Sequence, residues 1–237
     1  MFSLTRRGLA AASGLTVAIA SLAACSPSPS SHGLAVVATT TQICDYVTQI
    51  AARSTDISLD KTDASGQSAH VGAAPEGAAL TMSLTCLLAP NASAHEHEMT
   101  PAQTKALSEA DVMAVSGVDL EHFLDDAVAS SGFKGRMVVT SGVLTAADID
   151  NPGTPDPEVA YTIDRGGERV NVAPWPFPPE EAGEEPEFRF DPHVWTSPKG
   201  AHVQVANLGA GLAAAVPDAA SSINAATASY LEDIDAL

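Results

Sequence analysis

The chain of 237 residues is strongly acidic, with a formal net charge of −18 at neutral pH. This charge excludes nucleic-acid binding, which needs a surplus of Lys and Arg to replace the counterions on phosphates. Hydrophobic residues make up 45% of the chain and aromatic residues only 5%, so a core can form but has to be built largely from Ala, Val and Leu.

Residues 1–24 have the pattern of an export signal. A pair of arginines precedes an apolar run that is too short to span a bilayer as a helix. Leu22-Ala23-Ala24-Cys25 follows and resembles the processing box of bacterial lipoproteins, which implies cleavage before Cys25 and a lipid on its thiol. An ordinary signal peptide is the alternative, and both general and twin-arginine export are open. Residues 25–33, rich in Ser and Pro, are expected to form the tether to the membrane.

Four short apolar runs after the tether have the pattern of strands buried on both faces. Helical patterns separate them. The clearest helix start is Thr100-Pro101-Ala102-Gln103, in which Thr is the N-cap, Pro is the first helical residue and Gln completes a capping box. Alternating strands and helices favour a parallel sheet. We therefore expect an α/β fold with a four-stranded, mainly parallel sheet flanked by helices, its strands near residues 34–38, 84–88, 112–115 and 137–139.

Two stretches interrupt this pattern within a lobe that we assign to residues 34–216. Residues 54–79 are polar and Gly-rich, and residues 146–190 are rich in proline and glutamate, so both are predicted to be solvated loop insertions. A cation-gathering role for the acidic run is the alternative. A last helix lies within residues 217–237, and its apolar stripe continues to Leu237 without a Gly or a basic last turn. This pattern leads us to expect a truncated sequence.

Cys44 and Cys86 are the cysteines that follow Cys25. In an exported protein an even pair favours a disulfide, and two separately buried thiols are the alternative. A catalytic cysteine is disfavoured, because neither residue lies beside a His in a recognisable motif.

Two histidine-bearing segments have the chemistry of a metal site. Ala94-His95-Glu96-His97 lies in a polar loop between a predicted strand and a capped helix, where open α/β sheets place their ligands. In Asp191-Pro192-His193-Val194-Trp195 an acid lies beside a His, and a neutral imidazole held by a neighbouring acceptor is the usual ligand of a borderline metal. The pair of His95 and His97 would also suit a metallohydrolase, but no acid-and-His cluster follows to complete such a site.

In combination these features resemble the zinc/manganese solute-binding proteins of bacterial ABC importers. The resemblance rests on five segments in the family's order, which are the Cys25 box, Val36-Val37-Ala38-Thr39-Thr40-Thr41, the His95 segment, Lys105-Ala106-Leu107-Ser108-Glu109-Ala110-Asp111 and Asp191-Pro192-His193-Val194-Trp195. It implies that His95 and His193 are metal ligands. His97 falls at a position where this family usually has an aromatic residue. We therefore expect it either to have no role in binding or to contact a ligand without binding the metal itself.

The remaining histidines lie outside these motifs and receive no role. Asp119 is predicted to cap the helix after the third strand, with His122 on its polar side. The set without a role comprises His32, His70, His122 and His202.

The family's other two ligands, a His or Glu and then an Asp, belong to a second lobe, and nothing after His193 matches them. Residues 217–237 would then be the start of the helix that joins the lobes. Two imidazoles do not close a four-coordinate site, so this chain alone is expected to bind metal weakly. A third imidazole favours zinc and a carboxylate suits manganese, so the metal stays open, with a slight lean away from zinc because the long loop lacks histidine.

The resemblance implies a monomeric, exported lipoprotein anchored to the outer face of the cell membrane through Cys25. Such a protein captures zinc or manganese, delivers it to the permease subunit of an ABC importer, and has no enzymatic activity. An adhesive or structural surface lipoprotein of the same fold is one alternative. A metallohydrolase that uses His95 and His97 is the other.

Overall fold

The computed structural model describes residues 1, 33–153, 155–179 and 183–237, and every element below belongs to the unit His32–Leu237. Cys25, the predicted lipidation site, lies outside the described residues, as do the predicted signal segment beyond its first residue and His32. None of the helices in the described part of the chain combines the length and the apolar character that crossing a bilayer requires.

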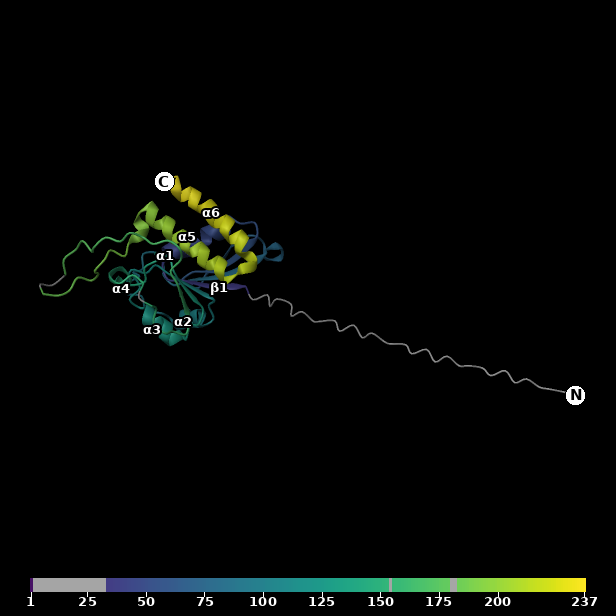
Figure 1. Ribbon diagram of the computed structural model, residues 1–237, viewed down its shortest axis with the longest axis horizontal. Coiled ribbons are helices and arrows are strands. Elements are labelled where there is room, and N and C mark those ends of the chain that lie inside the picture. The colour runs from purple at the N-terminus through teal and green to yellow at the C-terminus, as the bar shows by residue number, and fades with distance from the viewer. Residues whose placement is uncertain (2–32, 154, 180–182) are drawn as a thin grey trace. The chain divides into compact units, whose positions relative to one another are not determined.

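In the described residues, seven strands form one sheet in the order β3-β2-β4-β1-β5-β6-β7. Figure 1 shows the ribbon, with β1 and the helices labelled. Neighbouring strands are parallel except for β2 and β3, which form an antiparallel hairpin. The strands are β1 (Leu34–Ala38), β2 (Ile57–Thr62), β3 (Ser68–Gly72), β4 (Leu80–Cys86), β5 (Val112–Val115), β6 (Arg136–Val139) and β7 (Thr162–Asp164). The predicted mainly parallel α/β fold is confirmed.

The predicted number of four strands was wrong, because β2, β3 and β7 lie in the stretches that we had predicted to be loops. β2 has a short apolar alternation, with Ile57 and Leu59 fully buried, and β3 is an almost wholly exposed edge strand. β7 has only three residues and pairs with β6. These strands form because a neighbouring strand is available for pairing, and their own sequences carry little hydrophobic period.

Helices cover both faces of the sheet, and successive residues of the central strands serve opposite faces. Val36 belongs to the core under one set of helices, and Val37 belongs to the core under the other. α1 (Thr41–Ala52), α5 (Pro198–Ala215) and α6 (Ala220–Asp235) cover the first face, and α2 (Pro101–Ser108) and α3 (Leu124–Ser131) cover the second. The remaining helical segments are α4 (Ala146–Asp150) and the 3-10 turns η1 (Pro75–Gly77), η2 (Val194–Thr196) and η3 (Pro217–Ala219).

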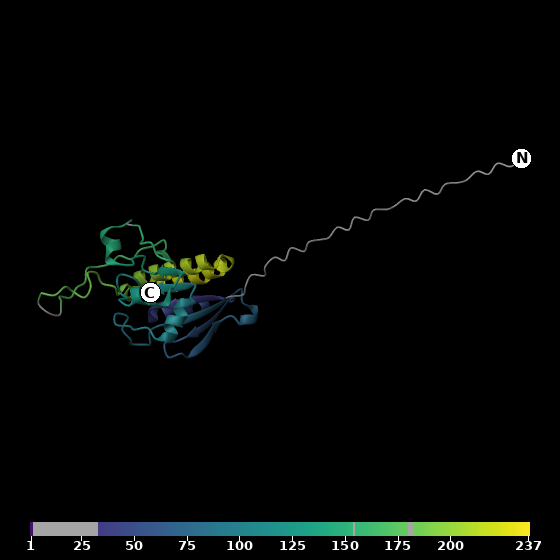
Figure 2. The ribbon, with the colours of Figure 1, turned by 90° about the horizontal axis from the view of Figure 1, so that it is seen from below.

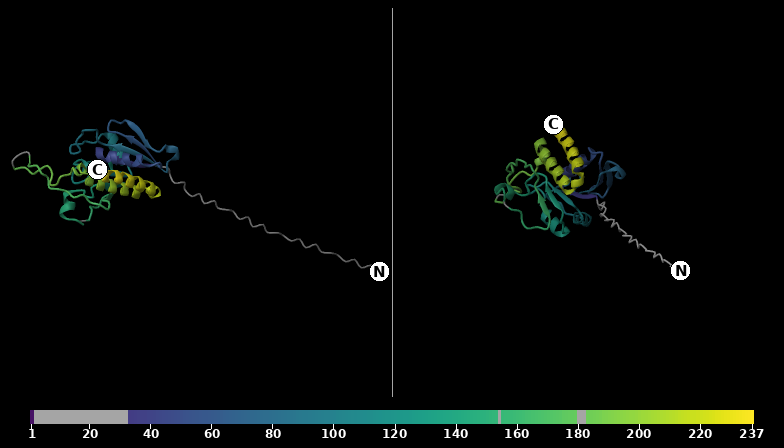
Figure 3. Two further views of the ribbon diagram at one scale, coloured as in Figure 1. Left: turned by 90° about the horizontal axis from the view of Figure 1, so that it is seen from above. Right: turned by 45° about the vertical axis from the view of Figure 1, so that its right-hand side comes forward.

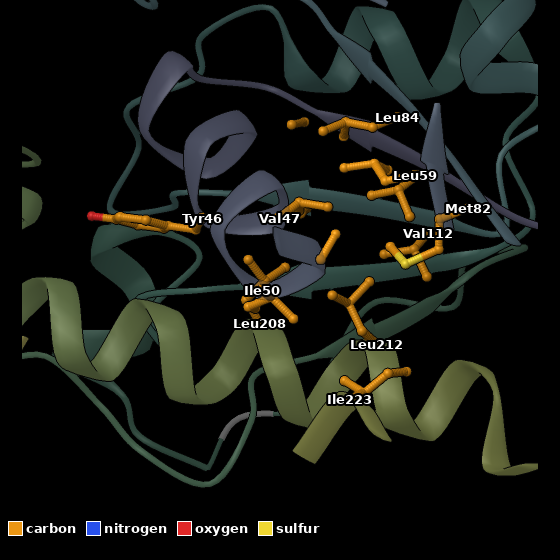
Figure 4. Close-up of a cluster of buried hydrophobic side chains, with 14 of the residues drawn as sticks. Tyr46, Val47, Ile50, Leu59, Met82, Leu84, Val112, Leu208, Leu212 and Ile223 are labelled. Atoms are coloured by element: carbon orange, nitrogen blue, oxygen red, sulfur yellow. The ribbon is translucent and has the colours of Figure 1, made fainter. Parts of the chain in front are cut away.

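The larger core packs α1 and α5 against the middle of the sheet. Ile50 from α1 and Leu208 and Leu212 from α5 meet strand residues such as Leu59 and Val112, all of them buried (Figure 4). Each of these side chains stabilises the fold by roughly 1.5–3 kcal/mol through removal of apolar surface from water. A core of aliphatic side chains with few aromatic ones agrees with the composition.

The predicted helix start at Thr100 is confirmed at α2. The Thr100 hydroxyl accepts a hydrogen bond from the Gln103 backbone N, and Gln103 Oε1 accepts one from the Thr100 backbone N, which is the predicted capping box. Ser197 caps α5 by accepting a hydrogen bond from the Gly200 backbone N. Such caps satisfy backbone N–H groups that have no partner inside the helix.

α6 lies alongside α5 in every view (Figures 2 and 3). Ile223, Thr227 and Ile234 of the predicted apolar stripe are buried. Gly209 of α5 permits a close approach, because a Cβ at this position would lie 2.4 Å from Thr227 Oγ1. The end of the described chain is thereby packed onto the same core as the sheet.

Cys44 on α1 and Cys86 at the end of β4 are joined by a disulfide with 42 residues of sequence separation. Both side chains are buried. The bond fastens the first helix to the strand that leads into the His95 loop.

Removal of this disulfide should destabilise the protein. Opening a loop of this length raises the entropy of the unfolded chain by an amount worth roughly 4 kcal/mol, and measured losses are about 2–5 kcal/mol. The double variant Cys44→Ala, Cys86→Ala should lose this amount of unfolding free energy in urea denaturation. A reducing agent should destabilise the wild type and leave the double variant unchanged. A wild type as stable with reductant as without it would contradict the assignment.

Candidate metal centre

The site lies at the carboxyl edge of the parallel strands, beside β1. The strand order reverses between β1 and β5, since the chain leaves β1 toward β2 on one side and leaves β5 toward β6 on the other. Connections that leave such a point in opposite directions open a crevice at the carboxyl ends of the strands. His95 belongs to the connection after β4, and His122 belongs to the connection after β5.

Glu121, a buried carboxylate, fixes the connection after β5. It accepts hydrogen bonds from the Ser116 backbone N at 2.6 Å, from the Gly117 backbone N at 3.0 Å and from Thr39 Oγ1 at 2.6 Å. Burial raises the pKa of Glu121, and these three donors act against that rise. Because Thr39 directly follows β1, the carboxylate joins the carboxyl ends of β1 and β5.

The same connection contains three successive residues with positive φ, Gly117 at 84°, Val118 at 59° and Asp119 at 56°. A β-branched residue such as Val rarely adopts this conformation, which costs on the order of 1–3 kcal/mol. The backbone N of Val118 donates to Val143 O at 2.8 Å, which holds the turn in place. Strained backbone of this kind is concentrated at functional sites.

Because of this turn, the following helix begins only at Leu124, with Phe123 as its N-cap. The prediction that Asp119 caps this helix was therefore wrong. His122 lies before the helix and not on its polar side. The reason is non-local, because Glu121 points inward to the ends of two strands and holds the chain in the turn.

Asp191 orients the imidazole of His193. Asp191 Oδ1 lies 2.8 Å from His193 Nδ1 and accepts a second hydrogen bond from the His193 backbone N at 3.0 Å. Because a carboxylate accepts the proton of Nδ1, the lone pair of the ring is carried by Nε2. The chain's two tryptophans flank this ring, with centroids at 5.9 Å for Trp175 and 5.2 Å for Trp195.

His95 faces His193, with ring centroids 5.5 Å apart and an interplanar angle of 73°. Burial lowers the pKa of His95, nearby His193 and His122 lower it further, and Glu187 acts in the opposite direction. The ring is therefore neutral near pH 7. Its Nδ1 is buried and has no hydrogen-bond partner among the described residues. A neutral imidazole with such a nitrogen fits the role of a ligand to a borderline cation.

Phe188 forms an apolar wall of the site. Its side chain is 4% exposed, and its ring centroid lies 4.9 Å from that of His95, 5.3 Å from that of His122 and 5.1 Å from that of Trp175. The aromatic residues of this wall were missed in the sequence, because they lie in the stretch predicted to be a solvated loop.

The two sides of that stretch pair near the site, where the Trp175 backbone N donates to Arg189 O at 3.0 Å and Pro174 forms a bridge with Phe190. Beyond this pairing, residues 176–179 and 183–187 extend outward (Figure 1). A Trp and a Phe within an otherwise acidic, proline-rich run were the available signal that part of it folds back.

His97 does not join the facing pair of His95 and His193. Its ring packs edge-on against Phe123 with centroids 5.0 Å apart, and burial lowers its pKa. His122, to which we assigned no role in the sequence analysis, lies 6.1 Å from His95 between ring centroids. Across the described residues, no three His, Cys, Asp or Glu side chains already form a group that could hold a metal ion.

The site therefore consists of histidines that separate connections bring to the carboxyl edge of a mainly parallel α/β sheet, as in a ligand-binding lobe. A model of the family described as zinc-uptake complex component A, periplasmic, matches residues 77–237. The chain belongs to this family of periplasmic metal-binding proteins, which is a transport family and not an enzyme family. The resemblance found in the sequence is thus confirmed at the level of the family.

Solved structures share the fold at low sequence identity. Zn(II)-bound AdcA from Streptococcus pneumoniae aligns with a TM-score of 0.52 and 16% identity over 86% of this chain and 31% of that one. The metal-dependent lipoprotein YcdH from Bacillus subtilis aligns with 0.50 and 16% over 85% of this chain and 52% of its own. The Mn-bound periplasmic metal binding protein from candidatus liberibacter asiaticus aligns with 0.50 and 16% over 84% and 52%. The chain thus spans about half, or less, of the length of these proteins.

Replacement of Glu121 by Gln should destabilise the fold by about 2 kcal/mol, because the amide NH₂ would face a backbone N–H that loses its acceptor. Urea denaturation measures this loss. The control is Glu109→Gln, which removes an exposed ion pair with Lys105 and should leave the unfolding transition nearly unchanged. Equal stability of both variants would show that the buried carboxylate does not hold this loop.

Proposed function

We propose that this protein is the solute-binding component of a bacterial ABC importer, which captures zinc or manganese outside the cell and delivers it to a membrane permease. The observation that carries the proposal is the facing pair of His95 and His193, with ring centroids 5.5 Å apart. Two imidazoles on one tetrahedral zinc ion, with metal–nitrogen bonds of roughly 2.0–2.1 Å, have ring centroids about 5 Å apart. The pair therefore has close to the spacing that a shared metal requires.

The surroundings of the pair suit reversible capture of a cation. Asp191 orients His193 through Nδ1 and so leaves Nε2 for the metal, and burial lowers the pKa of His95, which favours the neutral ring that binds a cation. The metal exchanges water for imidazole, and no covalent bond of a substrate is broken. Other groups complete the coordination shell, since two imidazoles leave positions open.

The charge of the protein and the periplasmic location of its family support the same function. A net charge of −18 draws cations toward the surface, and the exposed acids Glu184, Glu185 and Glu187 lie on the segment that carries Phe188. The family is periplasmic, and the Bacillus subtilis relative YcdH is a lipoprotein. In our proposal Cys25 carries the lipid that keeps the protein beside its permease.

A metallohydrolase is less well supported. That function would require His95 and His97 to bind one metal, whereas the His97 ring packs against Phe123. The family is a transport family, which also argues against it.

Replacement of either facing histidine should weaken metal binding. His95→Ala and His193→Ala should each lower the zinc affinity of the full-length protein by roughly 100-fold or more, because each removes one of the two facing imidazoles. Competition with a chromogenic chelator measures the affinity. In the wild type, zinc should also change tryptophan emission, because Trp175 and Trp195 flank His193.

His202→Ala serves as the matched control. His202 lies on α5 and forms an ion pair with Asp235, so its loss removes one histidine without touching the facing pair. Its affinity should stay within about twofold of the wild type, as expected for surface groups away from the ligands. Wild-type zinc affinity in both His95→Ala and His193→Ala would refute the proposed function.

A further inference from the structure

We propose that the projecting loop (residues 176–179 and 183–187) is a docking element, and that Phe177 inserts into an apolar pocket with a basic rim on a partner protein. In this proposal, which rests on the proposed function, the partner is the outer face of the membrane permease. We had predicted this stretch to be a solvated loop, and its exposed aromatic residue points to a more specific role.

Phe177 is the feature that first points to a partner. The residue is 62% exposed, and no other Phe, Tyr or Trp in the described part of the chain is exposed. The loop that carries it projects from the body of the protein, as the green segment at the left of Figures 1 and 2 shows. Aromatic side chains are enriched in the cores of protein interfaces, where they fill pockets on the partner. A protruding aromatic residue fits that role better than a recessed one.

The root of the projecting loop is held beside the metal site. The Trp175 backbone N donates to Arg189 O at 3.0 Å, which pairs the two sides of the loop. The Trp175 ring contacts the ring of Phe177, with centroids 5.1 Å apart, and stacks on that of His193 at 5.9 Å with an interplanar angle of 27°. Ring contacts therefore connect the exposed Phe177 to a candidate metal ligand. A partner that binds Phe177 lies close to the metal that it would receive.

Prolines restrict the backbone around Phe177. Pro176 precedes it, and Pro178 and Pro179 follow it. Because the proline ring fixes φ, this stretch has few conformations to lose when it binds. A side chain presented in this way is bound at a lower entropic cost than one on a flexible loop.

The acids of the projecting loop determine the charge of the partner. Glu184, Glu185 and Glu187 are exposed, and the sequence between Phe177 and Phe188 contains no Lys or Arg. Opposite charge on a partner speeds the encounter and excludes wrong partners. A membrane surface with anionic lipids would repel the same acids, so a basic protein surface is the better fit.

The test measures binding of the full-length protein to the permease of its importer, held in nanodiscs of neutral lipid, together with zinc affinity. Phe177→Ser should weaken permease binding by roughly 10-fold or more, as expected for an aromatic anchor. The double variant Glu184→Gln, Glu185→Gln should also weaken it, and the loss should be largest at low salt. Both variants should keep the zinc affinity of the wild type, since neither change removes His95 or His193.

Two controls are matched to these variants. Val159→Ser removes another exposed apolar side chain, which is 38% exposed. The double variant Glu76→Gln, Glu232→Gln removes the same charge at exposed positions on other segments. Both controls should bind the permease as the wild type does, and thermal unfolding should show that all variants are folded.

Each outcome bears on a different part of the account. Wild-type permease binding in Phe177→Ser would overturn the docking element, and so would losses in the controls as large as those in the loop variants. Equal binding of the wild type to empty nanodiscs would overturn it as well, because the loop would then bind lipid. Tight zinc binding by the wild type with any of these results would leave the proposed function intact, whereas a folded wild type that binds no zinc would refute that function.

Discussion

A buried carboxylate needs hydrogen-bond donors, and the way in which Glu121 obtains them organises the candidate metal site. Isolated burial of a charge is prohibitive, so the side chain must reach the backbone N–H groups of Ser116 and Gly117 and the hydroxyl of Thr39. These donors lie at the carboxyl ends of β5 and β1. The requirement therefore ties together the two strands beside the crevice. It also holds the turn between β5 and α3, in which three successive residues have positive φ and which carries His122.

The remainder of the site is assembled by contacts between distant segments. His95 leaves β4 on the other side of β1, and His193 arrives immediately before α5 with Asp191 as its partner. Phe188 connects His95 to the long acidic segment. The two buried or partly buried acids have different tasks, since Glu121 fixes backbone and Asp191 fixes the tautomer of an imidazole. Neither has to contact the metal in order to matter for binding.

Local sequence patterns correctly predicted the elements that form through interactions between residues close in the chain. Continuous apolar runs identified the central strands, and the Thr100 capping box identified α2. The edge strands β2, β3 and β7 were missed because they depend on pairing and have little period of their own. The Glu121 turn was missed because its partner Thr39 is 82 residues away. His122 and Phe188 were overlooked for the same reason, since only the folded chain brings them beside His95.

The central claim is that His95 and His193 bind one metal ion together, and anomalous diffraction at the zinc edge from crystals of the zinc-loaded full-length protein tests it most directly. The account predicts one strong peak between the two rings, at roughly 2.0–2.1 Å from a nitrogen of each. Absence of a peak there, with zinc found instead on the acidic segment or at His97, would contradict the account.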